Sequence, residues 1–190
     1  MQSKNLTEDI RLLDCSLPCC GSAAILLASE EIAKKFTDCP IWISGIGQKT
    51  ISAGFTKNTD LTTMKSTIDA ATDAYKMSNI QPRDVDVAEI HDAFTICEII
   101  ELEDLGFAKK GKGSSYARNC YETQDRKINP RGGLIGSGHP LGATGIAQIV
   151  EIVQQLQGKA EKRQVQGAKV GLVQNMSAAA TSSTVLILQS

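Results

Sequence analysis

Short apolar runs of strand length alternate with segments of helical pattern along this chain, and this alternation is the feature that most constrains its fold. The apolar runs are residues 22–28, 41–47, 84–90, 169–176 and 183–188. The helical patterns between them are residues 29–36, 62–80, 95–107 and 146–157. Strands that alternate with helices predict an α/β domain with crossover connections. The last two strands are near neighbours in the sequence, which permits an antiparallel pair.

Two of the helical segments carry an apolar face. In residues 62–80, apolar side chains recur at spacings of four, three and four, at Met64, Ile68, Ala71 and Tyr75. This pattern predicts that they form the buried face of that helix. In residues 146–157 the apolar stripe is broader, which predicts burial on more than one side. Residues 108–133 are rich in polar and charged side chains, and we expect a long solvated connection there.

The composition excludes several classes of partner. The 190 residues carry a net charge of −1, from 20 basic and 21 acidic side chains, so we expect no binding to nucleic acid or to an anionic membrane surface. Aromatic residues make up 4%, which disfavours a platform for base stacking. No apolar run approaches the roughly 20 residues that cross a bilayer, and the N-terminus lacks an apolar signal core. We therefore expect a cytoplasmic protein of one domain, or at most two.

The six cysteines do not have the spacing of a metal site or of a disulfide scaffold. They are Cys15, Cys19, Cys20, Cys39, Cys97 and Cys120. The stretch CSLPCC brings three of them together, but no second pair follows at the spacing of a zinc finger. We expect reduced and mostly buried thiols and no bound metal.

A glycine-rich loop precedes the last helix and carries one of the two histidines of the chain. The stretch GGLIGSGHPLGATG, residues 132–145, has glycine at six of its fourteen positions, and His139 lies in its middle. Pro140 restricts the backbone of His139, and the start of the following helix favours negative charge. A neutral His139 in this place can accept a thiol proton or donate a hydrogen bond to an oxyanion. From these residues alone, a tight turn that His139 caps is the simpler interpretation.

The second histidine, His91, directly follows the predicted strand 84–90. Ligand sites in open α/β sheets gather beyond the C-terminal ends of strands. The strand end at His91, the loop around His139 and the segment that follows Gln174 all meet that condition, and their convergence would bring both histidines together. Considered alone, His91 is a half-buried histidine with satisfied polar atoms, and Asp92 is the N-cap of the following helix.

Three stretches of the sequence resemble the C-terminal half of thiolases. They are VDVAEIHDAF (85–94), INPRGGLIGSGHPLGATGIAQ (128–148) and GAKVGLVQNM (167–176). Within that family they are similar to the subgroup that contains the sterol-carrier-protein thiolases and the archaeal acetoacetyl-CoA thiolases. The resemblance covers residues 22–190, which we take as one thiolase C-terminal domain, and residues 1–21 as a lead-in or linker.

The resemblance implies both a fold and a reaction. The fold is one α/β half of βαβαβαββ pattern, a mixed sheet with helices on both faces, normally paired with a similar N-terminal half in a five-layer αβαβα arrangement. The reaction is thiolysis of a 3-ketoacyl-CoA or the reverse Claisen condensation, an acyltransferase activity of lipid metabolism. Its substrate is a coenzyme A thioester, and no further cofactor is implied. The expected partners are acyl-CoA and an N-terminal thiolase half, in the same protein or on a separate chain, within a homo-oligomer.

The resemblance also implies roles for individual residues. His139 matches the catalytic histidine that activates the nucleophilic cysteine, and His91 matches a position that joins it in the first oxyanion hole. Ala93 and Phe94 match residues that line the pantetheine tunnel, and the turn from Asn175 to Ser177 matches the loop of the second oxyanion hole. The implied oxyanion and substrate-binding positions are Ala93, Phe94, Gly138, Asn175 and Ser177.

The sequence departs from the family pattern in three ways. The nucleophilic cysteine belongs to the N-terminal half, so we expect this chain alone to be inactive. The second catalytic cysteine of relatives is replaced at each position it can occupy, by Ala93, Ser137 and Asn175. Cys97, one helical turn from Ala93, is either a substitute or a core thiol. The last loop reads SAAATSS and lacks the glycines that would bring bare backbone near a thioester.

These departures leave two functions open. One is the C-terminal part of an acyl-CoA thiolase. The alternative is a thiolase-like subunit without Claisen activity, which binds acyl-CoA or acts as a retro-aldolase component with a small OB-fold partner.

Overall fold

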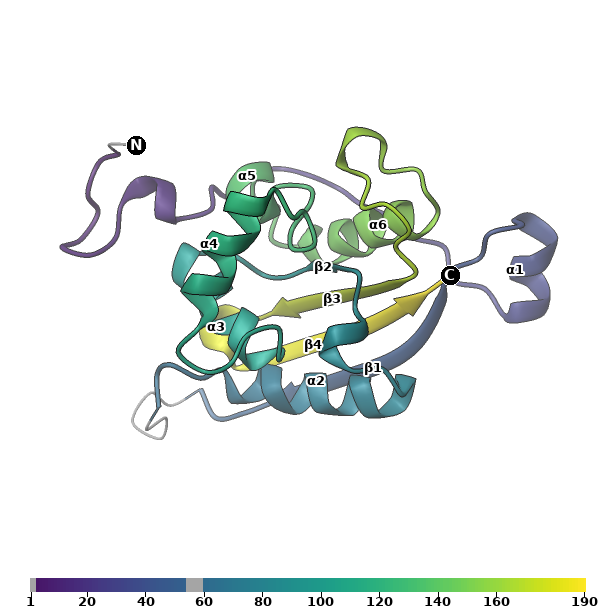
Figure 1. Ribbon diagram of the computed structural model, residues 1–190, viewed down its shortest axis with the longest axis horizontal. Coiled ribbons are helices and arrows are strands. Elements are labelled where there is room, and N and C mark those ends of the chain that lie inside the picture. The colour runs from purple at the N-terminus through teal and green to yellow at the C-terminus, as the bar shows by residue number, and fades with distance from the viewer. Residues whose placement is uncertain (1–2, 54–59) are drawn as a thin grey trace.

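A mixed four-stranded sheet lies at the centre of the computed structural model, which describes residues 3–53 and 60–190 (Figure 1). The strands are β1 (Trp42–Thr50), β2 (Val87–Glu89), β3 (Val170–Met176) and β4 (Ser182–Gln189), in the order β1-β4-β3-β2. Strand β4 runs antiparallel to both of its neighbours, and β2 runs parallel to β3. The expected antiparallel pairing of the last two strands is therefore confirmed.

Six α-helices and four short 3-10 helices accompany the sheet in the described residues. The α-helices are α1 (Glu30–Phe36), α2 (Lys65–Ser78), α3 (Thr95–Asp104), α4 (Gly113–Thr123), α5 (Gly133–Ser137) and α6 (Thr144–Leu156). The 3-10 helices are η1 (Leu12–Asp14), η3 (Pro82–Asp84), η4 (Glu161–Arg163) and η5 (Ala178–Ala180). Ile128 forms a single parallel bridge to Ala88 on the outer side of β2. With that bridge as a reduced third strand, the order of elements from β1 onward follows the expected βαβαβαββ pattern.

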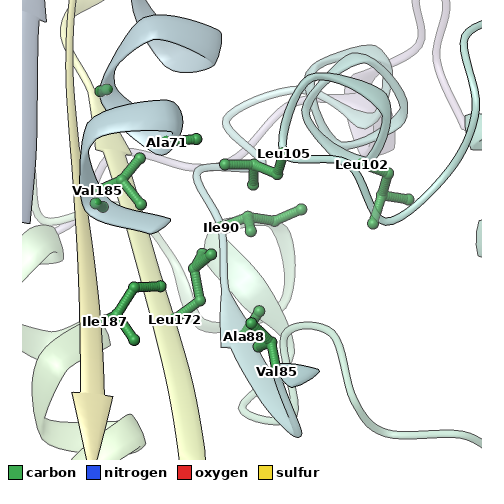
Figure 2. Close-up of a cluster of buried hydrophobic side chains, with 11 residues drawn as sticks. Ala71, Val85, Ala88, Ile90, Leu102, Leu105, Leu172, Val185 and Ile187 are labelled. Atoms are coloured by element: carbon green, nitrogen blue, oxygen red, sulfur yellow. The ribbon is translucent and has the colours of Figure 1, made fainter. Parts of the chain in front are cut away.

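The helices cover both faces of the sheet, as the expected fold requires. Alternate residues of β4 face opposite sides, as in any strand. Val185 and Ile187 pack with residues of α2 and α3 in one cluster, which also includes Leu172 of β3 (Figure 2). Leu188 packs on the other side, with Ile152 of α6. The sheet therefore lies between a layer that contains α2 and α3 and a layer formed by α6.

Helix α2 lies so close to β1 that only small residues fit between them. Ideal Cβ atoms built at Gly45 and Gly47 would lie 2.3 Å and 1.9 Å from the backbone oxygens of Ala74 and Ala70. The buried residues of α2 are Ser66, Thr67, Ala70, Ala71 and Ala74. The predicted face is therefore right at Ala71 but wrong at Met64 and Ile68, which are half-buried. Because α2 approaches the glycines of β1 so closely, small side chains and not large apolar ones occupy its buried face.

Helix α6 turns its polar side inward. Its buried residues are Thr144, Gln148, Glu151, Ile152, Gln155 and Leu156. Of the broad apolar stripe, Ile146, Ile149 and Val150 are half-buried, while Ile152 and Leu156 are buried. The inward polar side chains form hydrogen bonds with neighbouring segments, for example Gln148 with the end of β3. Burial on more than one side is thus observed, and one of the buried sides is the polar one, which periodicity does not indicate.

Three other expectations from the sequence are wrong. Residues 22–28 form no strand but an extended segment outside the sheet, with Leu26 90% and Leu27 71% exposed. Residues 108–133 are not a plain solvated connection, because they include α4, and Lys110 forms an ion pair with the buried Asp104 at 2.6 Å. The cysteines are free, but none is buried: Cys19, Cys20 and Cys39 are exposed and the other three are half-buried.

Neither a metal cluster nor a membrane span is found in the part of the chain that the structure describes. No group of three or more His, Cys, Asp and Glu side chains within residues 3–53 and 60–190 is arranged to hold a metal ion. No helix in those same ranges has the length and apolar character needed to cross a membrane.

We predict that Gly47→Ala lowers the free energy of unfolding by about 3 kcal/mol or more, because the new methyl group would overlap the backbone of α2. Urea denaturation followed by circular dichroism measures the change. Gly136→Ala is the matched control, since no atom lies within 4 Å of a Cβ at that position, and it should leave stability nearly unchanged. Equal stability of the two variants would contradict the close packing of α2 on β1.

Candidate functional site

The structure brings the two histidines of the chain together at the C-terminal end of β2. The ring centroids of His91 and His139 are 5.0 Å apart, with an angle of 86° between the ring planes, so the rings meet edge to face. His91 follows β2, and His139 lies in the loop between α5 and α6. Both rings line a cavity of about 640 Å³. The segments that the sequence placed at strand ends therefore converge, as expected.

The predicted site residues fall around this cavity with one exception. The residues that line it together with the histidines include Ala93, Phe94, Asn175 and Ser177. Gly138 does not line it. It lies in the loop directly before His139 and has a φ of 84°, a backbone conformation that favours glycine. An ideal Cβ on Gly138 would lie 2.8 Å from the sulfur of Cys19, so a larger residue would displace that segment.

Asp92 links the two histidines through the backbone. Its carboxylate accepts a hydrogen bond of 2.6 Å from the N–H of Leu134, in the first turn of α5. The expectation that Asp92 caps the following helix is wrong, because the N-cap of α3 is Phe94. A Cβ at Gly133 would lie 2.1 Å from the Asp92 carboxylate, so glycine is required where that carboxylate meets the helix. Burial, which outweighs the hydrogen bond from Leu134, raises the pKa of Asp92 to about 7.

The hydrogen bonds of His139 define which of its nitrogens carries the proton. Nδ1 of His139 lies 2.7 Å from the hydroxyl oxygen of Thr144. The same hydroxyl lies 3.1 Å from the backbone oxygen of Pro140, which only accepts hydrogen bonds, and a hydroxyl that donates there accepts from His139. We infer from this arrangement that the neutral ring carries its proton on Nδ1 and has a lone pair on Nε2. Burial lowers the pKa of His139, which favours this neutral form and suits the ring to act as a base.

His91 is more deeply buried and is also neutral at physiological pH. Burial, with the neighbouring His139 as a second cause, lowers the pKa of His91 to about 4. Its Nδ1 lies 2.9 Å from the side-chain nitrogen of Asn175, and its backbone N–H donates to the side-chain oxygen of Gln174 over 3.0 Å. Within the described residues, no hydrogen bond occupies the Nε2 atom of either ring. Both Nε2 atoms are thus available to a ligand.

A short segment near the N-terminus closes one side of the site, which sequence reasoning missed. The N–H of Ser16 donates to the backbone oxygen of Ala93, and the N–H of His139 donates to that of Leu17, each over 2.9 Å. This segment therefore connects the two histidine-bearing loops, and Ser16 and Pro18 line the cavity. Residues 3–21 show no strand or helix periodicity in the sequence, so no pattern could have indicated this role.

Cys97 also lines the cavity, but it is a poor acid or base. Burial, assisted by the nearby Glu101, raises the pKa of the Cys97 thiol to about 11. A thiol with so high a pKa stays protonated at neutral pH and is a weak nucleophile. The structure therefore favours a structural thiol over a substitute for the missing second cysteine.

The loop after β3 includes left-handed backbone, the conformation that glycine adopts most readily, although it contains no glycine. Ala179 and Ala180 have φ values of 57° and 50°, in the left-handed region. The Ser177 hydroxyl holds the loop through Thr181 at 2.8 Å and through the N–H of Ser182 at 2.9 Å. The loop thus has left-handed backbone at Ala179 and Ala180, although the sequence has no glycine there. Hydroxyl hydrogen bonds stabilise a backbone shape that relatives are expected to form with glycine.

We predict that Ala179→Gly raises the free energy of unfolding by about 0.5–1 kcal/mol. The left-handed conformation costs alanine roughly 1–2 kcal/mol, and the greater freedom of glycine in the unfolded chain offsets part of the gain. Thermal unfolding measures the change. Ala178→Gly is the matched control, because Ala178 does not have a positive φ, and it should destabilise the protein slightly. A loss of stability in both variants would contradict the strained loop.

Comparison with protein families finds a match that covers most of the chain. Residues 47–190 match the family model described as thiolase C-terminal domain-like. The matched region begins within β1 and includes both histidines, α5, α6 and the last two strands.

Curated relatives match over nearly the whole chain but are much longer. The chain is 42% identical to an acetyl-CoA acetyltransferase of Methanothermobacter thermautotrophicus, over 93% of this chain and 46% of that protein. It is 38% identical to sterol carrier protein 2 of Oryctolagus cuniculus, over 93% of this chain and 34% of that protein. The chain thus spans about half or less of the length of these relatives.

A solved structure named Ltp2-ChsH2(DUF35) aldolase has the same fold. The superposition has a TM-score of 0.83 and covers 99% of this chain and 49% of the other, at 24% sequence identity.

Proposed function

The chain belongs to the thiolase family as a C-terminal domain, and from that premise we propose that it supplies the base and oxyanion-binding groups of an acyl-CoA thiolase. The observation that carries the proposal is the neutral histidine pair on one cavity, with a lone pair on Nε2 of His139. The substrate in this proposal is a 3-ketoacyl-CoA, or two acyl-CoA molecules in the reverse direction. Coenzyme A enters as part of the substrate, and no metal or other cofactor is invoked.

The nucleophilic cysteine comes from an N-terminal half that pairs with this chain. The share of the relatives' length that the chain spans supports this, because it leaves room for a second half. Of the cysteines in the described residues, Cys97 lines the cavity, and its high pKa makes it a weak nucleophile. The half-buried apolar stripe of α6 and the exposed Leu26 and Leu27 offer surface for that half. We place the assembled enzyme in the cytoplasm, as an oligomer that acts in lipid metabolism.

In the thiolysis direction, His139 takes the thiol proton of that cysteine on its free Nε2. The thiolate attacks the 3-keto carbon of the substrate, the bond between C2 and C3 breaks, and acetyl-CoA leaves as its enolate. The oxygen of this enolate lies against the histidine pair, in a place where hydrogen-bond donors stabilise developing charge. Protonated His139 returns its proton to C2 of the enolate. Free coenzyme A then gives its thiol proton to His139, and its thiolate attacks the acyl carbon on the cysteine. The bond from the acyl carbon to the cysteine sulfur breaks, and the cysteine thiolate takes the proton back from His139.

The residues that replace the second cysteine explain why His139 has this double role in the proposal. The Ser137 hydroxyl donates to the backbone oxygen of Arg131 over 2.9 Å, and the side-chain amide of Asn175 has no titratable proton. Neither side chain is an acid comparable to a thiol. Imidazolium on His139 is therefore the acid that this half can offer.

The pair of neutral histidines on one cavity also supports a second candidate function. A retro-aldol cleavage of a 3-hydroxyacyl-CoA needs a base for the hydroxyl proton and donors for the enolate oxygen, but no cysteine nucleophile. The histidine pair meets both needs. In this alternative the chain is a retro-aldolase component that works with a small OB-fold partner, or a subunit that binds acyl-CoA.

We predict that this chain, co-expressed with its own N-terminal half or with that of the Methanothermobacter relative, cleaves acetoacetyl-CoA with added coenzyme A, and that the chain alone does not. His139→Ala in the assembled enzyme should lower kcat by about 10²–10⁴-fold, because the base for the thiol is lost. Loss of the acetoacetyl-CoA absorbance measures the rate. Cys120→Ser, on α4 away from the cavity, is the control and should retain full activity.

An assembly that binds coenzyme A but does not cleave acetoacetyl-CoA would overturn the thiolase proposal. Aldehyde or ketone release from a 3-hydroxyacyl-CoA by the same assembly would then establish the second candidate.

A further inference from the structure

We propose that Gln148 and Asn175 are positioning residues that fix the ring of His91 as a hydrogen-bond donor toward the cavity. This is the opposite role to that of His139, whose Nε2 accepts. The assignment of the proton follows from contacts in the described residues alone. Its use, to hold the oxygen of a thioester or enolate, rests on the proposed function.

The first step is the orientation of the Gln148 amide. Gln148 is a fully buried residue of α6, and its Nε2 lies 3.1 Å from the backbone oxygen of Gln174. A backbone carbonyl oxygen only accepts hydrogen bonds, so it faces the NH₂ group of Gln148 and not the amide oxygen. The amide oxygen of Gln148 must therefore point the other way, where it meets Asn175.

The second step is the orientation of the Asn175 amide. The Oε1 of Gln148 only accepts, so it faces the NH₂ group of Asn175, at 2.9 Å. The same Nδ2 atom of Asn175 lies 2.9 Å from Nδ1 of His91. An amide nitrogen donates but does not accept, so Nδ1 of His91 must be the acceptor. Both protons of the Asn175 NH₂ group are then used.

The third step is the protonation of His91 itself. A neutral imidazole carries one proton, and Nδ1 has to keep its lone pair for Asn175, so the proton resides on Nε2. The backbone of His91 is held at the same time, because its N–H donates to the side-chain oxygen of Gln174. A flipped ring would present a carbon to Asn175 and lose that hydrogen bond. The ring is therefore fixed in both orientation and tautomer.

The result is a pair of neutral rings with complementary Nε2 atoms. His91 presents an N–H and His139 presents a lone pair, 5.0 Å apart between ring centroids. A preorganised donor is worth about 10²–10³-fold in kcat where it faces a developing oxyanion. Gln148 acts from α6 without touching the cavity, because it is absent from the lining.

The test is nitrogen NMR of the imidazole rings in the complete 190-residue chain at neutral pH. Because the chain has two histidines, the spectrum contains two imidazole patterns, and His139→Gln assigns them. We expect the proton of His91 on Nε2 and that of His139 on Nδ1. A proton on Nδ1 of His91 would overturn the proposal.

Three variants test the relay. Asn175→Asp replaces the donor with an acceptor, so Nδ1 of His91 should gain a proton. Gln148→Leu removes the group that orients Asn175, so His91 should show a mixture of tautomers. Gln155→Leu is the matched control: Gln155 is an equally buried glutamine of α6, but its amide bonds to Glu151 and Arg163. It should lower stability and leave the His91 tautomer unchanged.

An unchanged tautomer in both Asn175→Asp and Gln148→Leu would show that the relay is only structural, and would overturn it. If either variant fails to fold, the tautomers of the unaltered protein still decide the proposal. The NMR needs no substrate, so it is independent of the thiolysis assay. A donor His91 in an assembly without thiolysis would refute the proposed function and leave this inference standing.

Discussion

The hydrogen bond from the first turn of α5 to Asp92 is the contact on which the geometry of the site depends. Asp92 is the neighbour of His91 in the chain, and α5 leads directly to Gly138 and His139. One carboxylate thus couples the end of β2 to the loop before α6. The left-handed Gly133, where no side chain fits beside that carboxylate, makes the contact possible. Without it, the hydrogen bonds of Ser16 and Leu17 would be left to connect the two histidine-bearing loops.

A network of buried hydroxyl and amide groups connects His91 to helix α2 and strand β4. Gln174 bonds to His91 on one side and to the hydroxyl of Thr67 on α2 on the other. Thr67 and Ser66 both bond to Ser183, and Ser66 donates to the backbone oxygen of Ala180 in the strained loop. Buried polar groups are costly unless they are paired, so such a network favours one arrangement of the core over others. The loop with left-handed alanines is held by the same network that holds His91.

The alternation of strands and helices predicted the order of elements from β1 onward, but it did not predict which helix faces are buried. The prediction was wrong where contact with another segment determines whether a strand forms or which residues are buried. Residues 22–28 are apolar enough for a strand, but a strand also needs a neighbour for its backbone, and the described chain gives them none. The buried face of α2 consists of small side chains such as alanine and serine, because Gly45 and Gly47 bring the backbones of β1 and α2 too close for large apolar ones. In α6 the buried polar side chains bond to other segments, Gln148 to β3 and Glu151 to Arg163, which a hydrophobic pattern cannot show.

The sequence indicated that the two histidines meet, but it did not show what each ring can do. Both histidines follow from their places in the motifs, since each lies beyond a strand end or before a helix. What each ring can do depends on contacts that are remote in the sequence. Thr144 sets the proton of His139, while Gln148 and Asn175, 57 and 84 positions from His91, set the proton of His91. Two identical side chains in one cavity can therefore have opposite functions, because the hydrogen bonds behind each ring differ.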